Sequence, residues 1–385
     1  MTGTDKRLHV LHVIGNLELG GAETLLSRLA TGKDGDVRHE IVCLGDRGGY
    51  SDQIERQRVT VHHLAMESPG SFIRGIPRFA RLVRRLRPDV IQSWMYLSNI
   101  MAGVVGRTAG IPVVWGIHGS TLEHLGRPSW LCAYAGGFAA PWLTDQVVNC
   151  SAGSAELHGR LGYNRAPASV VRNGYDPTAF FPDQAARSQA RHALGLQPDQ
   201  FVIGSVARWH SQKDIPNLLE AARRANAQGA QFVCLLIGAG LDADNQALAD
   251  AISAEGCEDF VRPLGPQRDL AKLVQALDLH VLASSGGEAF PNVVAETMLA
   301  GIPNAVTDVG DSAVMIGDTG WLVPPRRADL LADAIVEAHA EWRDHPKQWQ
   351  ARGESARERI ATNFTAAAMR ADYVRIWREA AGRPR

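Results

Sequence analysis

Two carboxylates stand eight residues apart in the segment Ser284-Ser-Gly-Gly-Glu-Ala-Phe-Pro-Asn-Val-Val-Ala-Glu296, across a glycine-rich loop and a helix start. Pro291 marks that start, because its ring presets a helical φ angle and its missing N–H would lack an intrahelical partner there. We therefore expect a helix from about Pro291 to Ala300. Glu288 then lies in the loop, and Glu296 faces inward from the second helical turn.

This segment can offer three different ligand contacts. The free backbone N–H groups at Asn292 and Val293 form the positive end of the expected helix, which suits a diphosphate. Glu288 can accept hydrogen bonds from the hydroxyl groups of a sugar, and Glu296 from those of a ribose. The chemistry predicted from the segment is therefore the binding of a nucleotide-activated sugar.

A loop with two cations follows the first strand expected in the second half of the chain. In Ala207-Arg-Trp-His-Ser-Gln-Lys213, Arg208 supplies a planar fork suited to phosphate and Lys213 a mobile point charge. The alternative is a pair of solvated surface cations.

Two further loops follow strands in the first half. Gly20 and Gly21 precede a helix expected from about Ala22, and paired glycines let a backbone approach a ligand closely. A plain tight turn explains them equally well. His118 comes directly after the fifth expected strand and can face a substrate there, although a lone histidine is more often a structural residue.

Gly238-Ala-Gly240-Leu-Asp-Ala243 raises a rival interpretation. It follows a strand and fits a relaxed dinucleotide fingerprint, so an NAD-dependent dehydrogenase has to be considered. Against it, the motif follows the second strand of its domain rather than the first. Asp242-Ala-Asp244 also has the spacing of a metal-binding D-x-D motif, but acidic residues at a helix start are expected for capping alone. We predict no metal site.

Short β-branched runs alternate with helical patterns along the whole chain, which is typical of parallel α/β sheets. The pattern predicts strands at 8–14, 38–44, 59–64, 89–92, 112–117, 146–150 and 168–172, and then at 201–206, 231–237, 260–264, 278–282, 304–308 and 321–323. The turn-forming cluster Asn173-Gly-Tyr-Asp-Pro177 separates the two series. We expect two doubly wound domains, 1–173 and 174–364, facing across a cleft, with 365–385 as a helix that packs back on the first.

Composition narrows the class of protein. The chain has 385 residues, 45% hydrophobic and 21% charged, and no apolar run near the roughly 20 residues that span a bilayer. Five scattered cysteines read as buried apolar residues in a reducing compartment, so we expect a cytoplasmic protein. Residues 1–172 carry 19 Lys and Arg against 14 Asp and Glu, whereas the rest carries 21 against 27. The basic half is the expected place for an anionic acceptor or lipid surface, and no nucleic-acid partner is expected.

Two segments of that basic half are candidates for contact with an anionic membrane at the inner face of the cell membrane. Residues 77–87 form a basic amphipathic helix with five arginines, and residues 128–143 carry two tryptophans and little charge. The alternatives are a helix packed on a sheet with solvated arginines, and a buried helix.

Taken together, these motifs resemble the family-4 retaining glycosyltransferases of the GT-B fold, over nearly the whole chain. The resemblance rests on Gly20-Gly21-Ala-Glu23, His118, Asn173-Gly-Tyr-Asp176, Arg208 with Lys213, and Glu288-x7-Glu296, in that order. There are departures: the usual Gly-Arg-Leu is Ala207-Arg-Trp209, Lys-Gly is Lys213-Asp214, and Glu-Gly-Phe is Glu288-Ala-Phe290. Ala289 adds a methyl group beside the expected sugar pocket, so the resemblance does not fix the identity of the donor sugar.

The resemblance implies a role for each matching position. Glu288 would contact the donor sugar, Glu296 the ribose, and Arg208 and Lys213 the diphosphate. The glycine loop would approach the phosphate and acceptor, and His118 the transferred sugar. The remaining donor-site candidates are Gly238, Leu264 (in the segment at the nucleobase), Phe290, Pro291, Asn292 and Val293.

The expected reaction is a metal-independent transfer of a hexose from a nucleotide-diphospho-sugar, with a UDP-sugar favoured, and with retention of configuration. No cofactor is expected beyond this co-substrate. The expected acceptor is a glycan or lipid-linked saccharide of cell-surface polysaccharide or lipopolysaccharide assembly. A GT-B epimerase or phosphorylase, a non-catalytic nucleotide-binding module and the dehydrogenase remain as alternatives.

Overall fold

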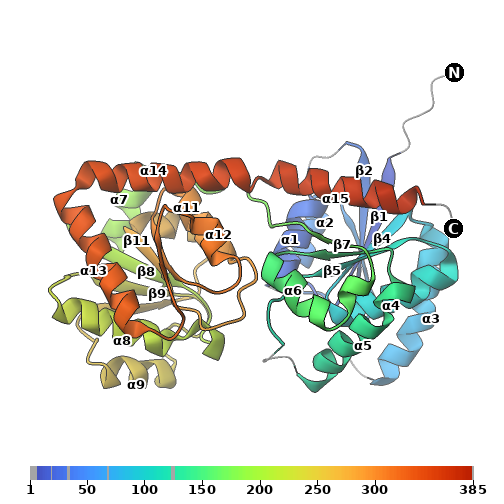
Figure 1. Cartoon of the computed structure of the whole chain (residues 1–385), viewed down its shortest axis with the longest axis horizontal. Helices are drawn as coiled ribbons and strands as arrows, with labels where there is room; N and C mark the ends of the chain where they lie inside the picture. Colours follow the sequence, from blue (N-terminus) through green and yellow to red (C-terminus); the bar gives the residue numbers. More distant parts are fainter. Residues whose placement is uncertain (1–6, 19, 33–34, 67–68, 123–125, 384–385) are drawn as a thin grey trace. The chain divides into compact units, whose positions relative to one another are not determined.

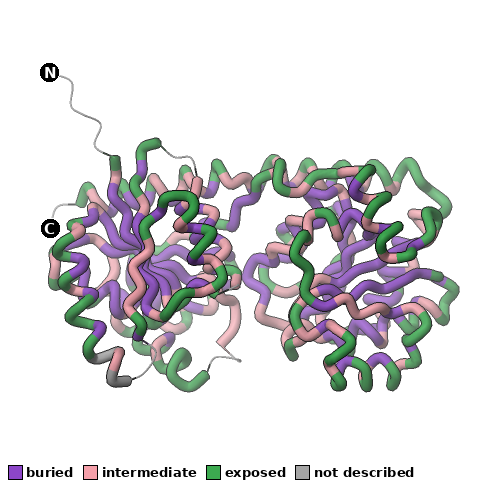
Figure 2. The backbone as a smooth tube through the Cα atoms, turned by 180° about the vertical axis from the view of Figure 1, so that it is seen from behind, coloured by how far each residue is buried: buried purple, intermediate pink, exposed green. Residues whose placement is uncertain are grey.

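The computed structural model describes residues 7–18, 20–32, 35–66, 69–122 and 126–383. It divides into two compact units, one of residues 1–174 with 366–385 and one of residues 175–365. Each unit is built around a parallel sheet whose strands are buried, with helices on its faces (Figures 1 and 2).

The sheet of unit 1 has seven parallel strands in the order β3-β2-β1-β4-β5-β6-β7. The chain starts in the middle, moves to one edge and then crosses back, which is the doubly wound arrangement. The strands are β1 (Leu8–Ile14), β2 (Val37–Cys43), β3 (Thr60–His63), β4 (Val90–Trp94), β5 (Val113–Ile117), β6 (Gln146–Asn149) and β7 (Ala168–Val170).

Helices connect these strands and cover both faces of the sheet. They are α1 (Gly21–Ala30), α2 (Ser51–Arg56), α3 (Pro69–Leu86), α4 (Tyr96–Ala109), α5 (Arg127–Leu143) and α6 (Ala152–Arg160). The C-terminal helix α15 (Ala366–Ala381) joins the same core through Tyr373, Ile376 and Trp377, which are buried among residues of β1, β2 and β4. The Trp377 indole N–H donates to Gln92 Oε1 at 2.9 Å. The chain therefore returns to its first unit at its end.

The sheet of unit 2 has six parallel strands in the order β10-β9-β8-β11-β12-β13, again doubly wound. Its strands are β8 (Val202–Val206), β9 (Val233–Ile237), β10 (Val261–Gly265), β11 (Leu279–Leu282), β12 (Asn304–Thr307) and β13 (Trp321–Val323). Its helices are α7 (Gln184–Ala193), α8 (Ile215–Ala227), α9 (Gln246–Ala254), α10 (Leu270–Leu273), α11 (Asn292–Leu299), α12 (Ser312–Ile316), α13 (Ala328–Asp344) and α14 (Pro346–Asn363).

All thirteen strands predicted from the β-branched runs are present, with ends that differ by at most two residues. The parallel sheets follow from the alternation of strand and helix, because a parallel crossover needs a connection long enough for a helix. Within the described part of the chain, no helix is long and apolar enough to cross a membrane.

Unit 1 contains a buried histidine, His12, in contact with the half-buried His39. The Trp94 indole donates to His12 Nδ1 at 3.3 Å, so the proton of His12 stands on Nε2, which lies 2.9 Å from His39 Nδ1. A second proton on His12 would sit on Nδ1 and point at the indole N–H of Trp94, so two donors would face each other. Burial lowers the pKa of His39 to about 4, and the pKa of His12 well below its ordinary value.

These neutral histidines predict acid sensitivity of unit 1. Their pKa values are lower in the folded than in the unfolded protein, so their stabilising contribution is complete above about pH 6.5 and is lost as pH falls toward 4. Each can remove up to about 1.4 kcal/mol of unfolding free energy per pH unit. The slope of the unfolding free energy against pH measures how many protons the protein takes up when it unfolds. In urea unfolding between pH 7 and 5, we expect His39→Gln to reduce this uptake by about one proton. The exposed His345→Gln is the control and should leave it unchanged.

Candidate functional site

The strand order of unit 2 places a crevice between β8 and β11, where the connections leave in opposite directions. Ligands of open parallel sheets bind outside the carboxyl ends of the strands at this point. The loop after β8 contains Arg208 and Lys213, and the loop after β11 contains Glu288. The two loops touch, because Ser285 N donates to Gln212 O at 2.8 Å. The topology therefore joins the two motifs that the sequence places about 80 residues apart.

Lys213 and Glu288 form an ion pair in this crevice. Lys213 Nζ donates to Glu288 Oε1, and Ser284 Oγ donates to the same oxygen at 2.7 Å. The Glu288 side chain is only 9% exposed, against 22% for Lys213. A carboxylate so removed from water needs such donors, since an unpaired buried charge is costly. Lys213 keeps two further N–H donors that can meet a ligand.

A buried histidine lies beneath this pair. His280 on β11 contacts Asn304 Oδ1 through Nδ1 at 2.6 Å, and burial lowers its pKa to about 4. Thr307 Oγ1 donates to the backbone oxygen of Ser284 at 2.6 Å. A neutral imidazole adds no second cation, so Lys213 remains the cation that is hydrogen-bonded to Glu288.

Two glycines with positive φ hold the loop around Glu288. At Gly310 (φ 62°), a Cβ atom would come within 2.0 Å of the backbone oxygen of Glu288. At Gly287 (φ 77°), it would come within 2.3 Å of the Gln212 side chain. The loop after β12 is also joined directly, because Asp311 N donates to Ala289 O at 3.0 Å. Three loops therefore fix the position of Glu288.

Helix α11 begins at Asn292, one residue later than expected. Pro291 is the N-cap residue that directly precedes the first turn. Its φ of −69° is the angle that the proline ring presets. The Tyr175 hydroxyl donates to Asn292 Oδ1 at 2.8 Å, and the Tyr175 ring stacks on Phe290 with centroids 6.3 Å apart. Phe290 and Pro291 are buried, whereas Asn292, Val293 and Glu296 are half-buried.

Arg208 is exposed and has no hydrogen-bond or ion-pair partner among the described residues. Its loop is fixed on both sides: Ala207 N donates to Ile237 O at 2.9 Å and Trp209 N donates to Ala239 O at 2.8 Å. The backbone is thus held while the guanidinium stays free to take a ligand anion.

The glycines of the dinucleotide-like motif have a different explanation in the structure. A Cβ atom at Gly238 would lie 1.8 Å from Ala207 O, and one at Gly240 would lie 2.8 Å from Trp209 Cβ. Both glycines are therefore needed for the close packing of the loops after β8 and β9. This weakens the dehydrogenase interpretation.

Asp214 stands where the resembling family has glycine, and the structure shows why glycine suits the position. Its φ of 49° and ψ of 47° lie in the left-handed region, where aspartate is among the better tolerated side chains. Burial raises the pKa of its carboxyl group. The departure from the family pattern therefore keeps the backbone turn that starts α8.

The structure corrects the expectation for the two aspartates after β9, whereas the one for Leu264 on β10 stays a prediction. Asp242 and Asp244 lie in a turn before α9, and the helix is capped by Asn245, whose side chain accepts from Leu248 N at 3.4 Å. The capping role expected for the two aspartates was wrong. Leu264 lies at the end of β10, half-buried, and its backbone oxygen accepts from Gln267 Nε2 at 2.7 Å.

The glycine loop of unit 1 follows β1 and leads into α1, which begins at Gly21. A Cβ atom at Gly20 would lie 2.3 Å from Glu23 Oε2, whereas one at Gly21 would meet nothing within 4 Å. Burial raises the pKa of Glu23 beside them. The protein itself therefore sets no strict requirement for glycine at these positions, because only the flexible side chain of Glu23 lies close to Gly20 and no atom lies close to Gly21. Leu19 of this loop lies outside the described residues.

His118 follows β5 and stacks on Trp94, with ring centroids 4.9 Å apart. Its Nε2 atom is buried and has no hydrogen-bond partner among the described residues. Burial lowers the pKa of His118 to about 3, so the ring is neutral at physiological pH. An imidazole of this kind can orient a polar group but supplies no positive charge.

Unit 2 thus gathers Arg208, Lys213, Glu288 and the start of α11 on the loops after β8 and β11, while Gly20, Gly21 and His118 belong to unit 1. Sequence reasoning missed Ser284, His280, Thr307 and Gly310. Only Ser284 had a signal in the sequence, since it opens the segment with the two carboxylates. His280, Thr307 and Gly310 act through contacts with residues that are distant in the sequence, and no local pattern indicates such contacts.

Comparison with known proteins identifies the family. Residues 19–179 match Glycosyltransferase Family 4, and residues 200–341 match Glycosyl transferases group 1. The D-inositol 3-phosphate glycosyltransferase of Gordonia bronchialis is 30% identical over 322 residues, which are 77% of this chain and 68% of that protein. The chain belongs to glycosyltransferase family 4. The enzyme of the same name from Streptosporangium roseum is 30% identical over 295 residues, 72% of this chain and 63% of that protein.

Solved structures show the fold of this glycosyltransferase. Anabaena HepE, crystallised with UDP and glucose, superposes with a TM-score of 0.85 at 20% identity, over 97% of this chain and 100% of that one. WaaG, a glycosyltransferase involved in lipopolysaccharide biosynthesis, gives a TM-score of 0.71 at 15% identity, over 96% and 99% of the two chains. The glycosyltransferase therefore has the GT-B fold, as the sequence predicted.

The ion pair in the crevice makes a prediction about stability. Lys213→Met leaves the Glu288 carboxylate buried without its cation, and should lower the unfolding free energy by roughly 2 kcal/mol in urea titrations. Adding Glu288→Gln should recover most of this loss. As a control, Lys272→Met removes an ion pair with Asp269 at 3.0 Å in which both side chains are more than half exposed. It should cost less than about 0.5 kcal/mol. A loss in the double variant equal to that of Lys213→Met would contradict the role assigned to the pair.

Proposed function

We propose that this glycosyltransferase transfers a hexose from a nucleotide-diphospho-sugar to a glycan or lipid-linked saccharide, with retention of configuration and without a metal ion. One observation carries the donor assignment: a buried carboxylate, an ammonium and a helix start meet at the switch point of the unit 2 sheet. Glu288 accepts hydroxyl groups of the sugar, Glu296 those of the ribose, and Leu264 lies against the base. Phe290, Pro291 and Gly238 shape the surrounding loops.

The proposed chemistry is departure of the nucleoside diphosphate from the anomeric carbon. The bond between that carbon and the phosphate oxygen breaks, and negative charge grows on the phosphate. Arg208, the remaining N–H donors of Lys213 and the helix N-terminus at Asn292 and Val293 stabilise this charge. Fixed donors of this kind contribute about 3–4 kcal/mol each where they have been measured. They make a divalent cation unnecessary in this proposal.

Retention is proposed because the residues supply no double-displacement pair. A retaining glycosidase holds two carboxylates roughly 5 Å apart. Here Glu288 is already bound by Lys213 and Ser284, which makes it a poor nucleophile. The departing phosphate would instead take the proton of the acceptor hydroxyl as that oxygen bonds to the same face of the sugar. Gly20 and Gly21 give the acceptor and phosphate close access to the backbone of unit 1, and neutral His118 orients the transferred sugar.

The test is turnover in EDTA with UDP-, GDP- and ADP-linked hexoses, followed by proton NMR of the product. We expect a UDP-sugar to be consumed, its α-linkage to be kept, and Glu288→Gln to lower kcat by at least about tenfold. An inverted product would exclude the retaining mechanism, and loss of activity in EDTA would exclude metal independence. Turnover without acceptor would indicate an epimerase, and a phosphate requirement a phosphorylase. NAD binding instead would support the dehydrogenase.

The acceptor proposal rests on two helices of unit 1 that both contact α4. On α3, Phe79, Leu82 and Val83 are buried, whereas the arginines at 78, 81, 84 and 85, and Arg87 directly after the helix, are exposed. On α5, five large apolar side chains are 43–67% exposed: Trp130, Leu131, Tyr134, Phe138 and Trp142. Helix α4 packs against both and adds exposed Leu97 and Val104. A basic face next to an apolar aromatic face suits the surface of an anionic bilayer.

A pocket in the basic face can take a lipid headgroup. It lies between β3 and α3 and is lined by His62, His63, Leu64, Arg78, Arg81, Leu82 and Arg85. Both ring nitrogens of His63 lack hydrogen-bond partners among the described residues. Its three guanidinium groups make the pocket a site for phosphate, whereas His62 Nε2 lies 3.0 Å from Glu40 Oε2 and His63 Nε2 lies 3.9 Å from Glu55 Oε1. We therefore propose that the enzyme works at the cytoplasmic membrane surface on a lipid-linked acceptor.

Flotation with liposomes containing anionic phospholipid tests this surface. Each arginine near an anionic membrane contributes about 1 kcal/mol, so Arg78→Ala/Arg81→Ala/Arg85→Ala should weaken partitioning roughly 100-fold. The control variant Arg223→Ala/Arg224→Ala/Arg343→Ala removes the same charge from exposed arginines of unit 2 and should float like the wild type. No flotation of the wild type, or equal losses in both variants, would contradict the proposal.

A further inference from the structure

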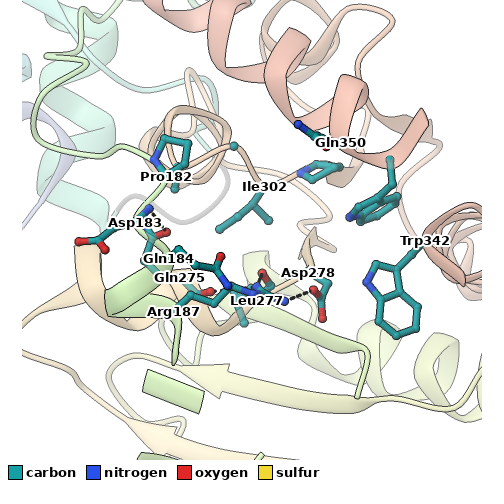
Figure 3. Close-up of a pocket in the computed structure, with 14 residues that line it drawn as sticks. Pro182, Asp183, Gln184, Arg187, Gln275, Leu277, Asp278, Ile302, Trp342 and Gln350 are labelled. Carbon is teal, nitrogen blue, oxygen red and sulfur yellow. Dashed lines mark hydrogen bonds and ion pairs between the residues drawn. The ribbon is translucent and has the colours of Figure 1, made fainter. Parts of the chain in front are cut away.

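A second pocket of unit 2 lies at the opposite edge of the sheet from the proposed donor site. It has a volume of about 420 Å³ and is bordered by the residues that precede β11 and β12, together with α7, α13 and α14 (Figure 3). The donor loops follow the carboxyl ends of the same parallel strands. Because the strands are parallel, the sheet itself separates the pocket from the donor site.

Two tryptophans form one wall of this pocket. Trp342 is on the last turn of α13 and Trp349 on the first turn of α14, and both are half-buried. Phe201 supports them, with ring centroids 5.0 Å from Trp342 and 6.0 Å from Trp349. Neither indole N–H has an acceptor among the described residues. The wall therefore combines aromatic surface with two unused donors.

The arginine and one of the two carboxylates in the pocket are neutralised. Arg187 donates to Asp278 Oδ1 at 2.5 Å and to the backbone oxygens of Gln275 and Leu277 at 3.0 and 2.9 Å (Figure 3). Asp278 also accepts from Arg191 at 3.2 Å and from Val202 N at 2.8 Å. The second carboxylate, Asp183, caps α7 by accepting from Ala186 N at 2.9 Å. The pocket therefore offers no free cation with which to select an anion.

Amide side chains complete the polar surface. Gln184 on α7 has no side-chain hydrogen bond among the described residues, and Gln350 donates to Glu354 at 2.8 Å while its amide oxygen remains available. A neighbouring pocket shares Trp342 and continues along the same edge, with Gln200, Asn226 and Gln231 among its lining residues. The two pockets meet at Trp342, and we call them together the tryptophan groove.

The walls of the groove are firmly held. Arg357 of α14 donates to the backbone oxygens of Leu299, Phe180 and Pro177. A Cβ atom at Gly353 would lie 2.3 Å from Gly301 O, so α14 contacts the turn after α11 without a gap. A site fixed before binding loses little entropy when a ligand enters.

We propose that the tryptophan groove binds a neutral oligosaccharide. A hexose ring has an apolar C–H face that can stack on an indole, and hydroxyl groups that can pair with indole N–H and amide groups. The paired arginines disfavour an anionic ligand, the carboxylate of Asp183 can accept from sugar hydroxyl groups, and the pockets on both sides of Trp342 offer room for more than one sugar residue. The groove would hold a glycan chain away from the donor site, which goes beyond the transfer reaction and does not depend on the donor assignment.

NMR of the protein labelled with ¹⁵N-tryptophan tests the groove. The nine tryptophans give nine indole signals, and Trp342→Phe and Trp349→Phe assign the two in the groove. We expect at least one of maltohexaose, cellohexaose and laminarihexaose to shift both signals with a Kd in the roughly millimolar range. The signal of Trp142, exposed on α5 in the other unit, should not move. UDP should not displace the sugar.

Paired glutamine variants give the decisive comparison. Gln184→Ala/Gln350→Ala should weaken binding about tenfold, as expected for two lost hydrogen bonds. Gln189→Ala/Gln348→Ala changes exposed glutamines on the same two helices outside the groove and should bind like the wild type. The proposal is overturned by the absence of shifts with all three hexasaccharides, by equal shifts of Trp142, by displacement with UDP, or by equal binding in the two double variants.

Discussion

The ion pair between Lys213 and Glu288 is the interaction on which the proposed donor site of unit 2 depends. A carboxylate at 9% exposure is stable only when charged and polar donors surround it, and Lys213 and Ser284 provide them. The loops after β8, β11 and β12 are joined at this carboxylate. The same contact that stabilises unit 2 therefore also fixes the position of a group able to read sugar hydroxyls.

The doubly wound topology explains why chemistry and support separate within unit 2. Parallel strands bring every carboxyl-end loop to one edge, where backbone groups are free to meet a ligand. The residues that precede the strands lie at the other edge, where the ion pairs of Arg187 and Arg191 with Asp278 hold them in place. That network pairs Arg187 and Arg191 with Asp278 and leaves a surface of aromatic, amide and carboxylate groups. The fold thus provides two chemically different surfaces on one sheet.

Departures from the family pattern follow backbone geometry. Asp214 occupies a left-handed conformation that glycine would accept more readily, and Trp209 fits only because Gly240 lacks a side chain. These replacements preserve the turn and the loop contacts that hold Arg208 and Lys213.

The sequence by itself determined the thirteen strands and the two parallel sheets, because local periodicity and turn residues act over short distances. It also singled out Arg208, Lys213, Glu288 and Glu296 as site candidates, and their roles stay predictions. It also placed the start of α11 to within one residue, since proline restricts the backbone wherever it stands. Only the tertiary structure decided that Lys213 and Glu288 share a hydrogen bond and that His280 lies beneath them. It also decided that Gly238 serves loop packing, and that α5 exposes its aromatic side chains. These facts depend on which strands become neighbours, and strand order is set by long-range packing that no local pattern records.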